Sequence, residues 1–183
     1  MSSPIRTLGS PSPPALIFDP PAWWKVALTL LAVAIVQSTL VPQLAIRGAV
    51  PSLVLLLVLW YGMRTGLVSG LLFGTIAGFC EDALAGWTGG AWTVSTAIVG
   101  AIAGRTAGTV ITESRTWLVP YVVLATIVRY GIYAVVLRAE DRTMSLPVAH
   151  AHGLLWQALL NALVAYLLLT FIPKTGVSRV GLR

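Results

Sequence analysis

Residues 62–78 read GMRTGLVSGLLFGTIAG, with a glycine at every fourth position. Positions four apart lie close to one face of an α-helix, so the spacing places Gly62, Gly66, Gly70, Gly74 and Gly78 in one register. A face without side chains lets a second backbone approach closely, which strengthens dispersion contacts between helices surrounded by lipid. The stretch therefore predicts closely packed helices within a membrane.

The same spacing returns in a later apolar segment, at Gly100, Gly104 and Gly108. We interpret both glycine faces as helix packing within the chain. The alternative is that a lipid-exposed glycine face in this part of the sequence is reserved for a partner protein.

The composition of the whole chain agrees with a membrane protein. Hydrophobic residues make up 57% of the 183 residues and charged residues only 10%, whereas a soluble domain carries about 25% charged residues. So few charges could not cover the surface of a soluble domain of this size. The net charge of +6 comes from basic residues scattered between apolar runs, which argues against a nucleic-acid partner and indicates topology signals instead.

Six apolar segments follow a proline-rich beginning, and they predict an all-α, polytopic protein with six transmembrane helices. The segments cover residues 23–41, 50–63, 66–81, 90–109, 117–137 and 153–172. A helix needs about 20 residues to cross a hydrocarbon core of about 30 Å, and the second and third segments are shorter than that. We interpret them as short or tilted spanning helices, with a re-entrant second segment as the alternative.

The ends of the chain differ from this transmembrane domain, which we place at residues 23–173. Residues 1–22 hold six of the 11 prolines and are predicted to form a disordered Pro/Ser-rich cytoplasmic tail. Residues 174–183 form a short basic cytoplasmic tail. With both termini inside, the inner side holds eight Lys and Arg residues and the outer side three, as the positive-inside rule requires. The inner residues are Arg6, Lys25, Arg64, Arg105, Arg115, Lys174, Arg179 and Arg183, and the outer ones are Arg47, Arg138 and Arg142.

Arg129 lies within a predicted spanning segment and has apolar residues on both sides, from Val122 to Val128 and from Tyr130 to Leu137. An arginine at the middle of a membrane helix costs about 2.5–3.5 kcal/mol on insertion scales, so it is not expected to face lipid. Glu81 and Asp82 end the third segment at a similar depth. We therefore predict a buried ion pair between Arg129 and one of these carboxylates. The alternatives are that the carboxylates face solvent and that Arg129 reaches the outer surface or a partner.

Other polar residues carry weaker signals. Gln157 and Asn161 lie four apart in the last segment, and Gln37 lies in the first; they predict hydrogen bonds between helices, with a polar ligand cavity as the alternative. His150 and His152 are interpreted as loop residues. No catalytic motif, cofactor motif or metal-ligand spacing is recognisable, so we expect no enzyme activity and no cofactor.

Trp87 lies within the glycine-rich turn predicted at residues 83–91, and Trp92 directly follows it. Tryptophan side chains are enriched at both lipid–water boundaries. They are interpreted as bilayer anchors or as contacts for a partner at the outer turn.

The order of several motifs resembles the rod shape-determining protein MreD family. The proline-led run at residues 50–57 (VPSLVLLL) resembles the second-helix motif of that family, although Ser52 stands where an acidic residue commonly follows the proline. Arg64-Thr65-Gly66, the helix end GFCED at residues 78–82, and GAIAGR at residues 100–105 continue the resemblance. The similarity covers about residues 50–108.

The resemblance implies a non-enzymatic inner-membrane component of the bacterial cell-elongation complex. It implies a scaffold in peptidoglycan synthesis with MreC as the main partner, together with RodA, its penicillin-binding transpeptidase and, indirectly, MreB. It also implies a fold similar to the substrate-binding subunits of energy-coupling-factor transporters. The alternative function is therefore a substrate-binding membrane subunit of a vitamin-type transporter, although the alanines of the first segment lack the four-residue spacing typical of such subunits.

Overall fold

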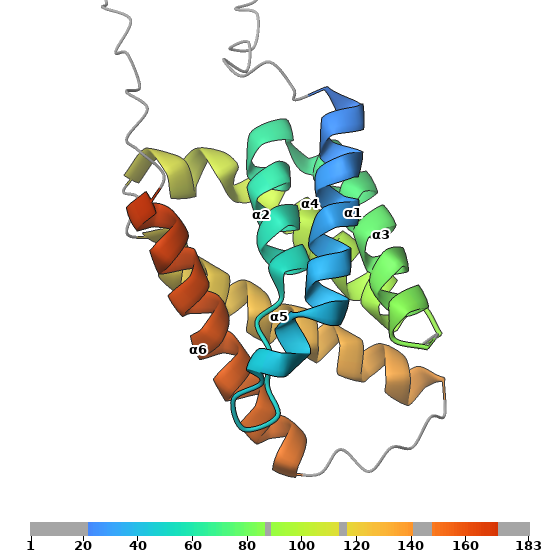
Figure 1. The fold of residues 1–183 in the computed structure, drawn as a ribbon. Coiled ribbons are helices and arrows are strands. Elements are labelled where there is room, and N and C mark those ends of the chain that lie inside the picture. The colour runs from blue at the N-terminus through green and yellow to red at the C-terminus, as the bar shows by residue number, and fades with distance from the viewer. Residues whose placement is uncertain (1–21, 87–88, 114–116, 141–147, 172–183) are drawn as a thin grey trace, which may run out of the picture.

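The computed structural model describes residues 22–86, 89–113, 117–140 and 148–171, and these residues form an all-helical bundle (Figure 1). Six α-helices and one short 3-10 helix make up the bundle. They are α1 (Trp23–Thr39), η1 (Val41–Leu44), α2 (Leu53–Thr65), α3 (Leu67–Leu84), α4 (Ala91–Glu113), α5 (Leu118–Ala139) and α6 (Val148–Phe171). The six helices correspond to the six apolar segments, so the predicted all-α fold is confirmed. The predicted tails lie almost entirely outside the described residues.

One prediction about a helix boundary was wrong. α6 begins at Val148, five residues before the apolar segment starts, so His150 and His152 lie in its first turns and not in a loop. The residues before Gly153 are too polar to be recognised by hydropathy, but a helix can continue beyond its apolar stretch into the interfacial region.

Gly66 separates α2 from α3 and lets the chain reverse direction there. Its φ of +93° lies in the region that favours glycine, and its N–H bonds to the carbonyl of Gly62 to end α2. The ladder of glycines is therefore divided between two antiparallel helices, with Gly62 on α2 and the last three on α3.

α4 is the central helix of the bundle and packs against α2, α3 and α5. Its sequence is the least apolar of the six helices, which a helix covered by protein instead of lipid tolerates. The small and polar residues that face protein are Thr93, Ser95, Thr96, Gly100 and Gly104. Among the described residues, α1, α3, α5 and α6 provide the four spans that are long and apolar enough to cross a membrane alone. These four helices expose large side chains such as Leu28, Ile76, Leu124 and Leu163, as a lipid-facing surface requires.

α2 is too short to cross the bilayer alone. Its 13 residues span about 20 Å at 1.5 Å per residue, against a hydrocarbon core of about 30 Å. Ser52, which caps its N-terminus, is buried at 3% exposure, and the chain between η1 and Ser52 completes this pass as non-helical backbone. Non-helical backbone at membrane depth is tolerated only where protein covers it, so the environment of Ser52 decides whether this fold is stable.

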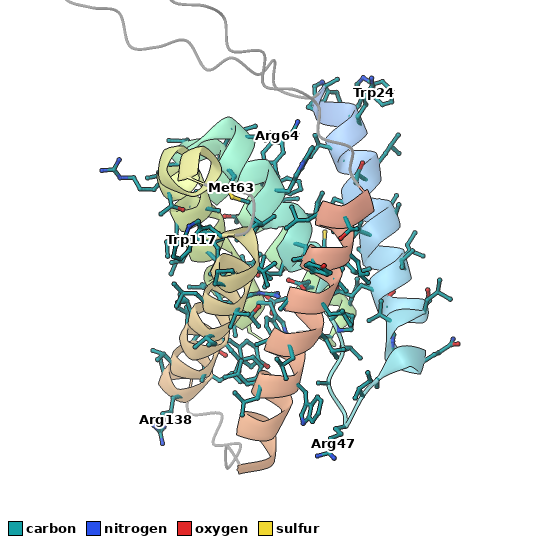
Figure 2. The ribbon with its side chains drawn as sticks, turned by 90° about the vertical axis from the view of Figure 1, so that its left-hand side faces the viewer. Trp24, Arg47, Met63, Arg64, Trp117 and Arg138 are labelled. Atoms are coloured by element: carbon teal, nitrogen blue, oxygen red, sulfur yellow. The ribbon has the colours of Figure 1, made fainter. Side chains whose placement is uncertain are left out.

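The two ends of the bundle differ in charge. Figure 2 shows Trp24, Arg64 and Trp117 at one end and Arg47 and Arg138 at the other. The first end also contains Lys25 in the first turn of α1 and Arg105 next to Gly104, which packs on the α2–α3 turn. The charged side chains that the structure describes at this end are all basic, whereas Glu81, Asp82 and Glu140 lie toward the opposite end.

Candidate functional site

Arg129 lies at the middle of α5 with 3% of its surface exposed and contacts three other helices. Its Nη1 donates to Ser52 Oγ at 2.8 Å and its Nε donates to Thr96 Oγ1 at 3.0 Å. Its Nη2 forms an ion pair with Glu81 Oε2 on α3. The guanidinium also lies 4.6 Å from the centroid of the Trp92 ring. These contacts replace the hydration that a buried arginine loses.

Glu81 connects this cation to two further helices. Its Oε1 accepts a hydrogen bond from Gln37 Nε2 on α1 at 3.1 Å, and its Oε2 accepts one from Thr96 Oγ1 on α4 at 3.3 Å. The carboxylate is therefore bonded to α1, α4 and α5 simultaneously. A buried carboxylate is tolerated when its charge is paired and its remaining lone pairs are occupied, and both conditions hold here.

Side chains from two other helices satisfy the buried N-terminus of α2. The first N–H groups of a helix have no partner within the helix. Here the N–H of Ser52 donates to Asn161 Oδ1 on α6 at 2.7 Å, that of Val54 donates to Gln37 Oε1 at 2.9 Å, and that of Leu55 donates to the Ser52 hydroxyl at 3.3 Å. These three bonds explain how α2 can begin inside the bundle.

Asn161 completes the arrangement. It is fully buried, and its Nδ2 donates to Thr126 Oγ1 on α5 at 3.0 Å while its Oδ1 accepts from α2. Each of the six helices thus contributes to one polar network, which we call the six-helix network. Its members are Gln37, Ser52, Glu81, Thr96, Thr126, Arg129 and Asn161.

We expect Asn161→Leu to lower the thermal unfolding temperature measurably. The change leaves the buried N–H of Ser52 without a partner and removes the bond from Asn161 to the Thr126 hydroxyl, and one unsatisfied buried group costs about 1–3 kcal/mol. Thermal unfolding of the purified protein in mild detergent measures the shift. Gln157→Leu, one turn earlier on α6, removes neither of these bonds and is the matched control; equal shifts for the two variants would contradict the role given to Asn161.

Asp82 does not join Arg129 but stabilises the start of α4. Its carboxylate accepts hydrogen bonds from the N–H groups of Trp92 at 3.2 Å and Thr93 at 2.9 Å, and from the Thr93 hydroxyl at 2.6 Å. A carboxylate at a helix N-terminus satisfies free N–H groups and interacts favourably with the helix dipole. Of the two candidate carboxylates, Glu81 therefore forms the ion pair with Arg129, whereas Asp82 caps the N-terminus of α4.

Trp92 is partly exposed and packs against aromatic side chains of α5. Its ring stacks on Tyr133 with centroids 4.0 Å apart and meets Tyr130 edge to face at 6.4 Å. The guanidinium of Arg129 lies against the same ring, so Trp92 shields one side of the six-helix network. The contact of Trp92 with a partner or the bilayer stays a prediction, since part of its surface is exposed, and Trp87 lies outside the described residues.

The glycines form an interface inside the chain. A Cβ added at Gly74 would lie 2.5 Å from the carbonyl oxygen of Thr96, and one added at Gly78 would lie 2.6 Å from the carbonyl oxygen of Trp92. Gly62 and Gly70 meet Gly100 in the same way. Gly104 meets the backbone of Gly66. α4 therefore occupies this face, which leaves it unavailable to a partner; the surroundings of Gly108 lie outside the described part of the chain.

The sequence reasoning missed Ser52, Thr96 and Thr126. Ser52 carried one signal, since a serine directly before an apolar run is a typical helix N-cap. Thr96 and Thr126 carried none, because threonine is common in membrane helices and often bonds to its own backbone, as Thr126 does to Val122.

The network is suited to holding helices together. Among the described residues, no buried side-chain nitrogen or oxygen lacks a hydrogen-bond partner, and no group of three or more His, Cys, Asp or Glu residues could hold a metal ion. The hydroxyls of Ser52 and Thr96 both accept from Arg129, whose guanidinium carries positive charge and has no proton-accepting capacity. The Thr96 hydroxyl also donates to the Glu81 carboxylate, so both hydroxyls are engaged in bonds between helices.

One comparison with known proteins identifies a family for this chain. A family model described as rod shape-determining protein MreD matches residues 22–175, a range that includes all six helices. No curated protein and no solved structure matches the chain.

Proposed function

Because the chain belongs to the MreD family of rod shape-determining proteins, we propose that it acts as a non-enzymatic scaffold in the bacterial cell-elongation complex. The family suggested by the sequence motifs is confirmed, and the chain is an all-helical, polytopic membrane protein with a part in determining rod shape. The scaffold would hold MreC as its main partner, with RodA and its penicillin-binding transpeptidase in the same assembly and MreB connected indirectly.

The six-helix network is the observation that carries this proposal. It bonds one polar side chain from each helix, or two in α5, to groups on other helices, and so fixes the relative positions of all six. A protein whose buried polar groups are used in bonds between helices keeps those helices, and therefore its outer surface, in a fixed arrangement. That property suits a platform on which other membrane proteins assemble.

The charge distribution supports an orientation for this scaffold. Lys25, Arg64 and Arg105 lie at the end of the bundle where α1 begins, and the positive-inside rule assigns that end to the cytoplasm. We therefore propose that the protein resides in the inner membrane with both termini cytoplasmic. The transmembrane domain at residues 23–173 would then lie between two cytoplasmic tails.

Affinity purification from mild-detergent membranes tests the scaffold function. We expect the tagged full-length protein to retain MreC, with or without RodA and its transpeptidase, and mass spectrometry of the eluate identifies them. A second membrane protein of similar size with the same tag is the control for carry-over.

An eluate that contains an ATPase module with a small transmembrane coupling protein, and no MreC, would contradict the scaffold. That result would favour the substrate-binding subunit of a vitamin-type transporter.

A further inference from the structure

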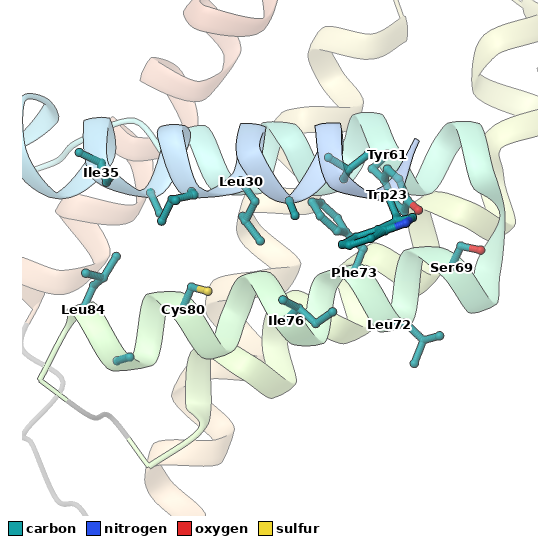
Figure 3. Close-up of a pocket in the computed structure, with 15 residues that line it drawn as sticks. Trp23, Leu30, Ile35, Tyr61, Ser69, Leu72, Phe73, Ile76, Cys80 and Leu84 are labelled. Atoms are coloured by element: carbon teal, nitrogen blue, oxygen red, sulfur yellow. The ribbon is translucent and has the colours of Figure 1, made fainter. Parts of the chain in front are cut away.

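An apolar groove lies between α1 and α3, on the side of α3 that faces away from the glycine interface (Figure 3). Its volume is about 680 Å³, and its walls are almost entirely aliphatic and aromatic. Ala27, Leu30 and Leu31 line it from α1, and Phe73, Ile76 and Cys80 line it from α3. Several of these side chains are exposed in the protein alone, so the groove opens sideways toward the bilayer.

The groove is shorter than the hydrocarbon core of the bilayer. Its lining residues run from Trp23 to Ile35 along α1 and from Ser69 to Leu84 along α3, which are about 18 Å and about 22 Å at 1.5 Å per residue. The hydrocarbon core is about 30 Å thick. Just beyond Ile35, a hydrogen bond between Gln37 and Glu81 also joins α1 to α3. A helix that crosses the membrane would extend beyond both walls of the groove, whereas an acyl chain fits within them.

The open end of the groove lies at the basic end of the bundle. Trp23, Tyr61 and Ser69 line this end, and Figure 3 shows the three side chains close together there. Arg64 is three residues beyond Tyr61, in the last turn of α2, and therefore lies on a neighbouring part of the same helix surface. Positive charge and a hydroxyl group at the mouth of an apolar groove complement an anionic headgroup attached to an acyl chain.

We propose that this groove binds an anionic phospholipid, with one acyl chain between α1 and α3 and the phosphate beside Arg64 and Ser69. The proposal rests on the groove and the charges at its mouth, and it stands whether or not the protein is a scaffold.

Native mass spectrometry of the full-length protein tests the proposal. The protein is released from detergent after incubation with phosphatidylglycerol or with phosphatidylcholine of the same acyl composition. We expect about fivefold more bound phosphatidylglycerol than phosphatidylcholine, because one basic side chain near an anionic lipid strengthens binding by about this factor. Arg64→Gln should abolish this preference, whereas Arg105→Gln, at the same end but on α4, should preserve it.

The acyl chain has its own test. Ala27→Phe places a ring in the groove and should lower the retention of both lipids at least severalfold, whereas Ala32→Phe, on the opposite face of α1, should not. Equal retention of the two lipids by the wild-type protein would overturn the headgroup assignment. Unchanged lipid retention in Ala27→Phe, or cross-linking of a partner's transmembrane helix from position 27 in membranes, would overturn the groove assignment.

Discussion

Replacing Arg129 with leucine is expected to destabilise the folded protein by about 3–5 kcal/mol, the usual effect of removing one partner from a buried ion pair. The change leaves the Glu81 carboxylate without its cation and the hydroxyls of Ser52 and Thr96 without their donor. Because these groups belong to α2, α3 and α4, the loss should loosen the whole bundle. Thermal unfolding in mild detergent, together with the yield of monodisperse protein, measures the effect.

A double variant separates the cost of an unpaired charge from the loss of packing. Arg129→Gln combined with Glu81→Gln keeps polar groups at both positions but removes both charges, so it should recover a large part of the lost stability. Arg138→Leu is the matched control, since Arg138 is exposed in the last turn of the same helix and its removal should change stability by less than about 0.5 kcal/mol. Wild-type stability in Arg129→Leu would contradict the central role of the ion pair.

The variant Gly74→Val is expected to destabilise the folded protein by about 3 kcal/mol, which is at the upper end of the usual cost of overpacking. The added Cβ would meet the carbonyl oxygen of Thr96 at 2.5 Å and the Cα of Ala97 at 3.0 Å, and both atoms belong to the backbone. Backbone cannot move aside as a side chain can, so α3 must separate from α4. Thr96 also bonds Arg129 and Glu81, so this separation should weaken the six-helix network. Thermal unfolding of the variant measures the loss.

Gly131→Val is the matched control for this substitution. A Cβ at Gly131 would have no atom within 4 Å, although the position is also in the interior of a membrane helix. Valine has a slightly higher helix propensity than glycine, so the control should be neutral or slightly stabilising. Equal destabilisation at both positions would show that the glycines act through the conformational freedom of the backbone and not through close helix contact.

The fold class and most of the helix boundaries could be predicted from the sequence. Hydropathy is a local property, so the apolar segments could be recognised without tertiary information. The cost of burying Arg129 likewise predicted that a carboxylate lies near it. The glycine spacing predicted close packing, but it did not show that Gly66 would divide the ladder between two antiparallel helices that face α4.

Which polar groups meet depends on how the six helices are arranged in space. Glu81 and Asp82 are adjacent and equally acidic, yet neighbouring residues point about 100° apart around a helix, so one faces Arg129 and the other the start of α4. Ser52 and Asn161 are separated by 109 positions and come together only because α2 begins inside the bundle. Without water in the bilayer core, each of these polar groups must find its partner in another helix, and the rotation and depth of all six helices together select that partner.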